Sequence, residues 1–92
     1  MIVRLRLFGV LENYLGGKRV EVQLPEAATL RQLWDALDAR FGDSLPAEYW
    51  DRERKRFRRA VAVMISDVEV EDDTYTLSDQ QEIFLLPPMV GG

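Results

Sequence analysis

The sequence contains no cysteine and no histidine among its 92 residues. The absence of cysteine excludes disulfides, thiolate catalysis, iron–sulfur ligation and a cysteine-ligated zinc site. The absence of histidine removes the usual base of a nucleophile–base pair and the one side chain that titrates unperturbed near neutral pH. We therefore expect a protein that holds no metal ion and is not catalytic alone.

Long apolar runs are also missing. The longest, residues 60–65 and 83–90, fall well short of the roughly 20 residues that a membrane span needs. Arg4 and Arg6 interrupt the apolar residues of the N-terminus, which is unlike a signal peptide. The net charge of −4 argues against a dedicated nucleic-acid binder, whose surface is basic. We expect a cytoplasmic protein that has neither a membrane nor a nucleic acid as its partner.

What is present begins with two alternating segments. Residues 2–8 and 18–24 alternate apolar and polar side chains, which is the pattern of strands with one buried face. The short glycine-containing loop at 9–17 joins them and predicts a hairpin.

A helix is predicted from residue 30 to residue 41. Thr29 is a good N-cap, and Gln32 three residues later completes a capping-box pattern. Gly42 stands where a C′ glycine ends a helix. We expect an apolar stripe at helical spacing to face the core; it consists of Leu30, Leu33, Trp34, Leu37 and Phe41.

The second half of the chain predicts two further strands, at 60–65 and 82–86. Between them, residues 67–73 are expected to form a short strand or turn. Before them, the polar connection 43–59 is expected to hold a short exposed helix at 46–57.

This order of elements predicts an α+β fold of the β-grasp, or ubiquitin-like, type. The first and last strands would lie parallel at the centre of a mixed sheet of about four to five strands, with one main helix on one face. A chain of this length makes a single domain with one modest core. We expect that domain to span residues 1–86, and residues 87–92 to form a flexible, protruding tail.

The tail is the most informative part of the sequence. Pro87 and Pro88 stiffen its base because each ring fixes φ near −65°. Gly91 and Gly92 put a carboxylate on a backbone without side chains, which is able to thread a narrow channel. Six residues reach at most roughly 20 Å beyond the body. We expect the reactive group of this protein to be the carboxylate of Gly92.

Four stretches resemble the ubiquitin-like sulfur-carrier family, and within it the small subunit of molybdopterin synthase. The resemblance covers nearly the whole chain, and its specific part is the ending with an apolar strand, two prolines, two apolar residues and Gly-Gly. Ser66-Asp67 departs from the family's frequent Asn-Gly. The matching stretches are residues 2–8, 29–33, 60–65 and 82–92.

The resemblance implies a chemistry carried out by partners. A ubiquitin-activating-type adenylyltransferase would use ATP and magnesium to adenylate Gly92, and a sulfur-donor enzyme would convert the adenylate to a thiocarboxylate. The molybdopterin synthase large subunit would then accept the tail, and the sulfur would go to a pterin precursor. Carriers for transfer-RNA thiolation or thiamine synthesis and ubiquitin-like protein modifiers stay open as alternatives. This chain would bind no cofactor itself.

The expected strand alternation also defines a docking face. If Ile83 and Leu85 point toward the helix, Phe84 and Leu86 point away from it, together with Met64 on the neighbouring strand. Such a contiguous apolar patch usually marks a partner site. We expect the patch and the tail residues to bind the activating enzyme and the acceptor subunit; the tail residues are Pro87, Pro88, Met89 and Val90, with Gly91 beside the reacting group. The alternative is that the loop 43–59 covers the patch.

Two charged runs complete the sequence. Residues 52–59 are either an RNA or phosphate patch, with Trp50 and Phe57 as stacking groups, or a salt-bridged connector. We favour the connector, because the run is short and the chain is acidic. The acidic run 69–73 lacks the spaced ligands and central glycine of a calcium loop, so we expect a solvated turn.

Overall fold

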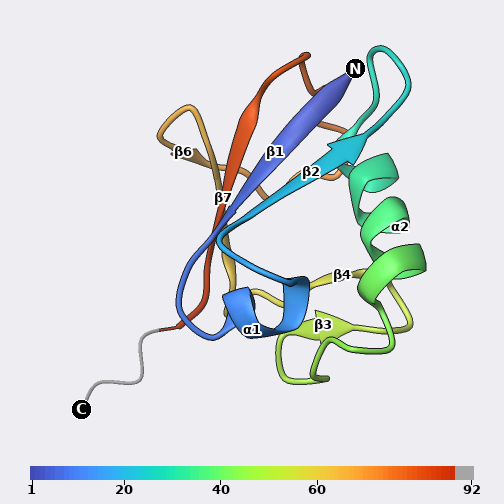
Figure 1. Ribbon diagram of the computed structural model, residues 1–92. Helices are drawn as coiled ribbons and strands as arrows, with labels where there is room; N and C mark the ends of the chain where they lie inside the picture. Colours follow the sequence, from blue (N-terminus) through green and yellow to red (C-terminus); the bar gives the residue numbers. More distant parts are fainter. Residues whose placement is uncertain (89–92) are drawn as a thin grey trace.

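The computed structural model describes residues 1–88, and its centre is a five-stranded mixed sheet (Figure 1). β1 (Ile2–Leu7) and β7 (Glu82–Leu86) run parallel in the middle, as the sequence predicts. β2 (Arg19–Gln23) pairs antiparallel with the other side of β1. β5 (Ala62–Ile65) and then β6 (Val68–Glu69) continue the sheet beyond β7 in the order β2-β1-β7-β5-β6. The β-grasp prediction is therefore confirmed.

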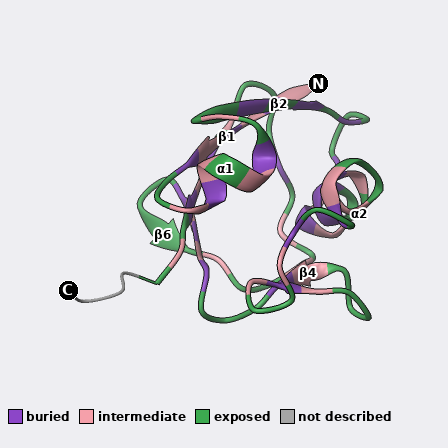
Figure 2. Ribbon diagram, turned by 60° about the horizontal axis from the view of Figure 1, so that its bottom comes forward, coloured by how far each residue is buried: buried purple, intermediate pink, exposed green. Residues whose placement is uncertain are grey.

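The main helix, α2 (Leu30–Phe41), lies across one face of this sheet (Figure 1). Thr29 and Gln32 form the predicted capping box, in which the Thr29 N–H donates to Gln32 Oε1 over 3.0 Å. Four residues of the predicted stripe are buried, and Phe41 at the helix end is partly buried. Figure 2 shows the buried side of α2 turned toward the sheet. The core thus lies between α2 and the inward side chains of β1, β2, β5 and β7.

The helix ends differently from the prediction. Gly42 has φ −52° and ψ −40°, which is right-handed, so it is not a left-handed C′ glycine. Glycine is needed here for space, because a Cβ at residue 42 would lie 2.6 Å from the backbone oxygen of Asp38. The pattern located the helix end correctly but assigned the wrong physical reason to the glycine.

The connection between β1 and β2 is more ordered than the predicted loop. It contains a short helix, α1 (Leu11–Leu15), which buries Leu11 and Leu15 against the core. Gly16 ends α1 in the left-handed conformation, with φ 86°, which glycine adopts without a steric penalty. The hairpin pairing itself is confirmed by the antiparallel register of the two strands.

The predicted helix at 46–57 is wrong. This segment forms a two-stranded ribbon of β3 (Trp50–Asp51) and β4 (Arg56–Phe57), in which Trp50 pairs with Phe57. Trp50 is fully buried, and its ring meets those of Trp34 and Phe57 edge to face at centroid distances of 6.4 and 4.9 Å. Burial of two aromatic side chains favours the ribbon, and the basic residues between them form its exposed turn.

The hairpin of β5 and β6 turns through Ser66 and Asp67. Both residues have positive φ, 52° and 65°, which is the signature of a two-residue type I′ turn. Asn-Gly is the usual sequence for this turn. Ser66-Asp67 adopts the same geometry, at some cost in backbone strain because neither residue is glycine. The expected short strand or turn at 67–73 contains a two-residue strand, β6, and turn and irregular structure elsewhere.

Within residues 1–88, no helix is both long and apolar enough to cross a membrane.

Candidate functional site: the open sheet face and the root of the tail

The strand β7 divides its side chains between the two faces of the sheet as predicted. Ile83 and Leu85 are fully buried under α2. Phe84 is partly exposed, and Leu86 is 36% exposed on the opposite, open face. The alternation follows from the strand period of two, which makes the last strand both a core element and a surface element.

Pairing between strands gathers the outward residues into one patch. Met64 lies opposite Phe84, and Ala62 lies opposite Leu86, in the antiparallel register of β5 and β7. Phe8, just beyond β1, adds an aromatic ring 5.9 Å from that of Phe84 and is 38% exposed. We call Phe8, Met64, Phe84 and Leu86 the open-face patch.

Phe8 is the member of the patch that the sequence prediction missed. Phe8 is two residues after Arg6, which points outward like Arg4. Extending the alternation of β1 by one residue would therefore have predicted that Phe8 lies on the open face. Beside the patch, the surface has a hollow of about 300 Å³; its lining is Met64, Ser66, Asp67, Gln81, Glu82 and Phe84.

The neighbouring part of the open face is charged. The Arg6 guanidinium lies 5.6 Å from the centre of the Phe84 ring and pairs with Glu82 at 3.4 Å. Arg4 pairs with Glu21 across β1 and β2 at 3.1 Å. An apolar patch bordered by charged pairs is the arrangement of a partner site with a polar rim.

The alternative in which the loop 43–59 covers this patch is wrong. That loop contains the ribbon of β3 and β4, which packs against α2 on the opposite side of the sheet (Figure 1). Its aromatic residues, Trp50 and Phe57, are buried there. Among the described residues, the face that carries Phe84 therefore stays open.

The root of the tail adjoins the patch. Pro87 directly follows β7 and is partly buried, whereas Pro88 is exposed. The ring of Pro87 lies close to Gly9, since a Cβ built on Gly9 would be 3.3 Å from Pro87 Cγ. The remaining predicted tail residues, Met89, Val90, Gly91 and Gly92, lie outside the described residues. The domain boundary after residue 86 stays a prediction.

The basic run of residues 52–59 is a salt-bridged connector, as favoured from the sequence. Arg56 pairs with Asp73 at 3.5 Å, Arg58 with Asp51 at 3.8 Å, and Arg59 with Glu71 at 3.7 Å. Trp50 and Phe57 are 0% and 5% exposed, so neither ring is available to stack on a base. The RNA interpretation therefore loses its stacking groups.

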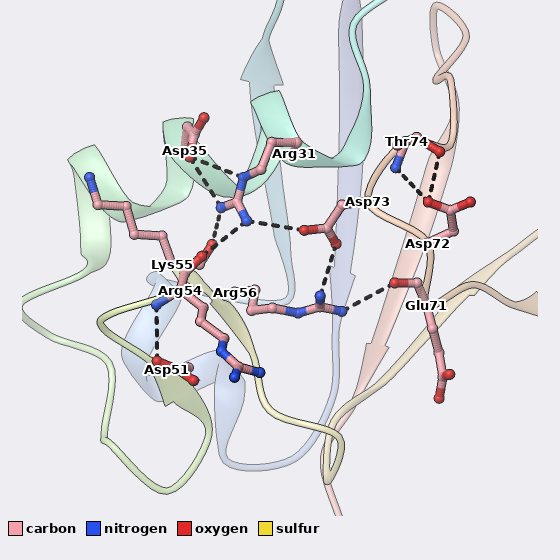
Figure 3. A network of polar contacts seen from close by, with 10 residues as sticks. All are labelled: Arg31, Asp35, Asp51, Arg54, Lys55, Arg56, Glu71, Asp72, Asp73 and Thr74. Carbon is pink, nitrogen blue, oxygen red and sulfur yellow. Dashed lines mark hydrogen bonds and ion pairs between the residues drawn. The ribbon is translucent and has the colours of Figure 1, made fainter.

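Part of the acidic run is less solvated than predicted. Asp73 is held between Arg31 of α2, at 3.0 Å, and Arg56 of β4 (Figure 3). Arg31 also donates to the backbone carbonyls of Arg54 and Lys55 in the ribbon turn. We call Arg31, Arg56 and Asp73 the ribbon clamp, because it ties helix, ribbon and the loop after β6 together. Asp73 is a structural ion-pair partner.

Hydrogen bonds to backbone N–H groups lower the pKa values of two turn carboxylates. The N–H groups of Arg54 and Glu53 hold the pKa of Asp51 below its ordinary value. At the other end of the sheet, the Ile2 N–H donates to Asp79 over 2.8 Å and lowers that pKa. Both effects stabilise the charged form of the carboxylate, which is partly buried in Asp51 and exposed in Asp79. They do not assemble an acid–base pair.

These features place a partly exposed apolar patch beside Pro87, the root of the tail. Solved structures with the same architecture include SAMP1 from Haloferax volcanii, at 21% identity and a TM-score of 0.82 over all of both chains. A chain of the complex of subunits 1 and 2 of molybdopterin-converting factor from Helicobacter pylori has 23% identity and a TM-score of 0.64, again over all of both chains. A chain of the BexX/CysO complex from Amycolatopsis orientalis has 23% identity and a TM-score of 0.69, covering 98% of this chain and 99% of that one.

Such likenesses establish the class of fold, a ubiquitin-like β-grasp. The chain belongs to the ThiS family, whose model matches residues 5–92. It is therefore a small ubiquitin-like sulfur carrier, and this is not a family of catalytic enzymes. No sequence among the curated proteins matches it. Two of the similar structures are complexes with a partner protein.

Proposed function

We propose that the chain carries sulfur as a thiocarboxylate on Gly92 and donates it within a transferase complex. The observation that carries this proposal is the family match, which runs through residue 92 and so includes the Pro87-Pro88 base and the Gly91-Gly92 end. The open-face patch at the root of that segment supplies a docking surface beside it.

The chemistry explains the division of labour with partners. A carboxylate is a poor acyl electrophile, so an activating adenylyltransferase must first join Gly92 to AMP, releasing pyrophosphate from magnesium-bound ATP. The terminal sulfur of a donor enzyme's persulfide then attacks the acyl carbon and displaces AMP, which gives an acyl disulfide. A second thiol of the partner cleaves its S–S bond, leaving the thiocarboxylate on Gly92 and a disulfide on the partner. Gly91 has no Cβ, so the backbone is able to approach a partner's active site closely. The acid–base groups for these steps belong to the partners.

The most specific form of the proposal is a role in molybdopterin synthesis. The tail would enter the large subunit of molybdopterin synthase and deliver sulfur to a pterin precursor. The two prolines before the apolar pair support this assignment, and so does the likeness to a chain of the two-subunit molybdopterin-converting factor. The likeness to SAMP1, a small archaeal modifier protein, favours a second candidate, in which Gly92 is joined to lysines of other proteins.

The test is the intact mass of the untagged protein after incubation with its host's lysate, ATP and a sulfur source. We expect a gain equal to the exchange of one oxygen for sulfur, and no gain in a variant without Gly91 and Gly92. A known carrier charged in the same lysate is the control. An unchanged mass, with the C-terminus confirmed at Gly92, would contradict the carrier role.

The charged protein from this experiment also distinguishes the molybdopterin assignment from the protein-modifier candidate. Sulfur lost from the charged protein only when the synthase large subunit and the pterin precursor are added supports the molybdopterin assignment. High-mass conjugates that disappear with Gly92 favour the modifier.

A further inference from the structure

We propose that Gly9 is a positioning residue that seats the ring of Pro87 and so sets the direction in which the tail leaves the sheet. Its predicted effect on sulfur charging rests on the proposed function, but the contact itself is a property of the fold.

The register of the central strands brings the two residues together. β1 and β7 run parallel with Leu7 opposite Leu85, so two further steps place Gly9 opposite Pro87. Proline has no N–H and is unable to extend the ladder, so the chain departs from the sheet at this point. Figure 1 shows the turn between β1 and α1 beside the end of β7, at one corner of the molecule.

Gly9 suits this corner for two reasons. Its φ of +58° is left-handed, so it ends β1 and turns the chain toward α1. It also leaves room for the proline, because a Cβ at residue 9 would lie 3.3 Å from Pro87 Cγ, closer than an ordinary contact. A side chain at residue 9 would therefore push Pro87 outward by a few tenths of an ångström.

The two prolines of the tail consequently have different roles. Pro87 is partly buried and rests on the body, whereas Pro88 is exposed. Because φ of each proline is fixed, a change in the seat of Pro87 is passed along the rigid dipeptide to the residues that follow. A small displacement of Pro87 at the base of the tail becomes larger at the reacting end of the chain. There, a misplacement of about 1 Å costs up to roughly 100-fold in rate.

The chain offers a matched control at Gly16. This residue is also left-handed, with φ +86°, but a Cβ there would meet nothing within 4 Å. Asparagine tolerates left-handed backbone better than most residues, so Gly9→Asn and Gly16→Asn carry similar backbone strain. They differ in the contact with Pro87.

The direction of the tail is measured directly in the cysteine-free background. A nitroxide attached through Val90→Cys broadens the backbone amide signals of the surface that the tail visits. We expect Gly9→Asn to move this footprint and Gly16→Asn to leave it unchanged. In a Pro87→Ala background, which lacks Cγ, Gly9→Asn should have no further effect. An identical footprint in all variants, or a shift that persists without the proline ring, would overturn the inference.

The functional readout uses the same pair without the label. We expect kcat/KM for charging by the activating enzyme to fall roughly 3- to 10-fold in Gly9→Asn and to stay unchanged in Gly16→Asn. Equal kcat/KM values for the two variants would contradict the functional half of the inference. If the unsubstituted protein is not charged, the carrier proposal fails, and the label footprint still decides whether Gly9 directs the tail.

Discussion

Two aromatic clusters lie on opposite faces of the same sheet, and only one of them is closed. Trp34 of α2 meets Trp50 and Phe57 of the ribbon edge to face, and all three are at most 5% exposed. Phe8 and Phe84 meet at 5.9 Å on the other face, and Phe8 is 38% exposed. Both clusters consist of large apolar rings, so composition does not distinguish them.

The difference lies in what the chain has available to cover each face. The helix α2 and the ribbon are both used on the first face, and the ribbon clamp keeps them together. No described element covers the second face around Phe84, which adjoins the root of the tail. Burial assigns the first cluster to stability, and we propose that the exposed second cluster serves recognition. Substitutions should separate the two roles.

The largest effect is expected at the closed cluster. Trp50→Ala removes a fully buried ring and the hydrogen bond from its Nε1 to Asp38 Oδ1. We expect a loss of about 3–5 kcal/mol in the free energy of unfolding, which is typical of such truncations. Denaturant unfolding measures this loss. Trp50→Phe, which keeps a ring, should cost less; equal stability of Trp50→Ala and the unsubstituted protein would contradict the assignment.

The next effect is expected at the open cluster, and in binding. Phe84→Asp places a charge in the open-face patch and should weaken binding to the activating enzyme or the acceptor subunit by about 30-fold or more, as for a hot-spot residue. Unfolding should change by about 1 kcal/mol or less because the ring is already partly exposed. Val68→Asp is the control, since Val68 is apolar, 60% exposed and outside the patch. Unchanged partner affinity in Phe84→Asp would remove the docking role.

Substitution in the ribbon clamp should have an intermediate effect on the free energy of unfolding. Asp73→Asn keeps the shape of the side chain but removes the charge that joins Arg31 to Arg56. Because the carboxylate is only 21% exposed, we expect a loss of about 1–2 kcal/mol in stability. The loss should shrink in Arg31→Ala, where the clamp is already broken, and a double-mutant cycle measures this coupling. Additive losses would mean that the two residues act independently.

The sequence predicted most of the molecule from local signals and from the order of its elements. Strand alternation placed Ile83, Phe84 and Leu85 on their correct faces, and the capping box at Thr29 located the start of α2. The parallel pair at the centre followed from the order of elements.

The misses arose where the structure depends on distant contacts. Whether residues 46–57 form a helix or a ribbon is decided by the burial of Trp50 against Trp34, which a local pattern does not contain. Asp73 was expected in solvent because its partners, Arg31 and Arg56, lie 42 and 17 positions away along the chain (73 − 31 and 73 − 56). The contact of Gly9 with Pro87 likewise requires the parallel register of two strands at opposite ends of the sequence.

The smallest effect is expected at the turn before β7, where the Asp79 carboxylate ties this turn to the start of β1. The Ile2 N–H that donates to its carboxylate lowers the pKa of Asp79 in the folded protein. The charged carboxylate therefore contributes stability above the ordinary aspartate pKa, and this contribution is lost as the pH falls through the lowered value. We expect Asp79→Asn to be slightly less stable near neutral pH and to match the unsubstituted protein in strong acid. Unfolding midpoints measured across this range check the sign; a difference independent of pH would mean that the charge of Asp79 contributes nothing to the stability of the fold.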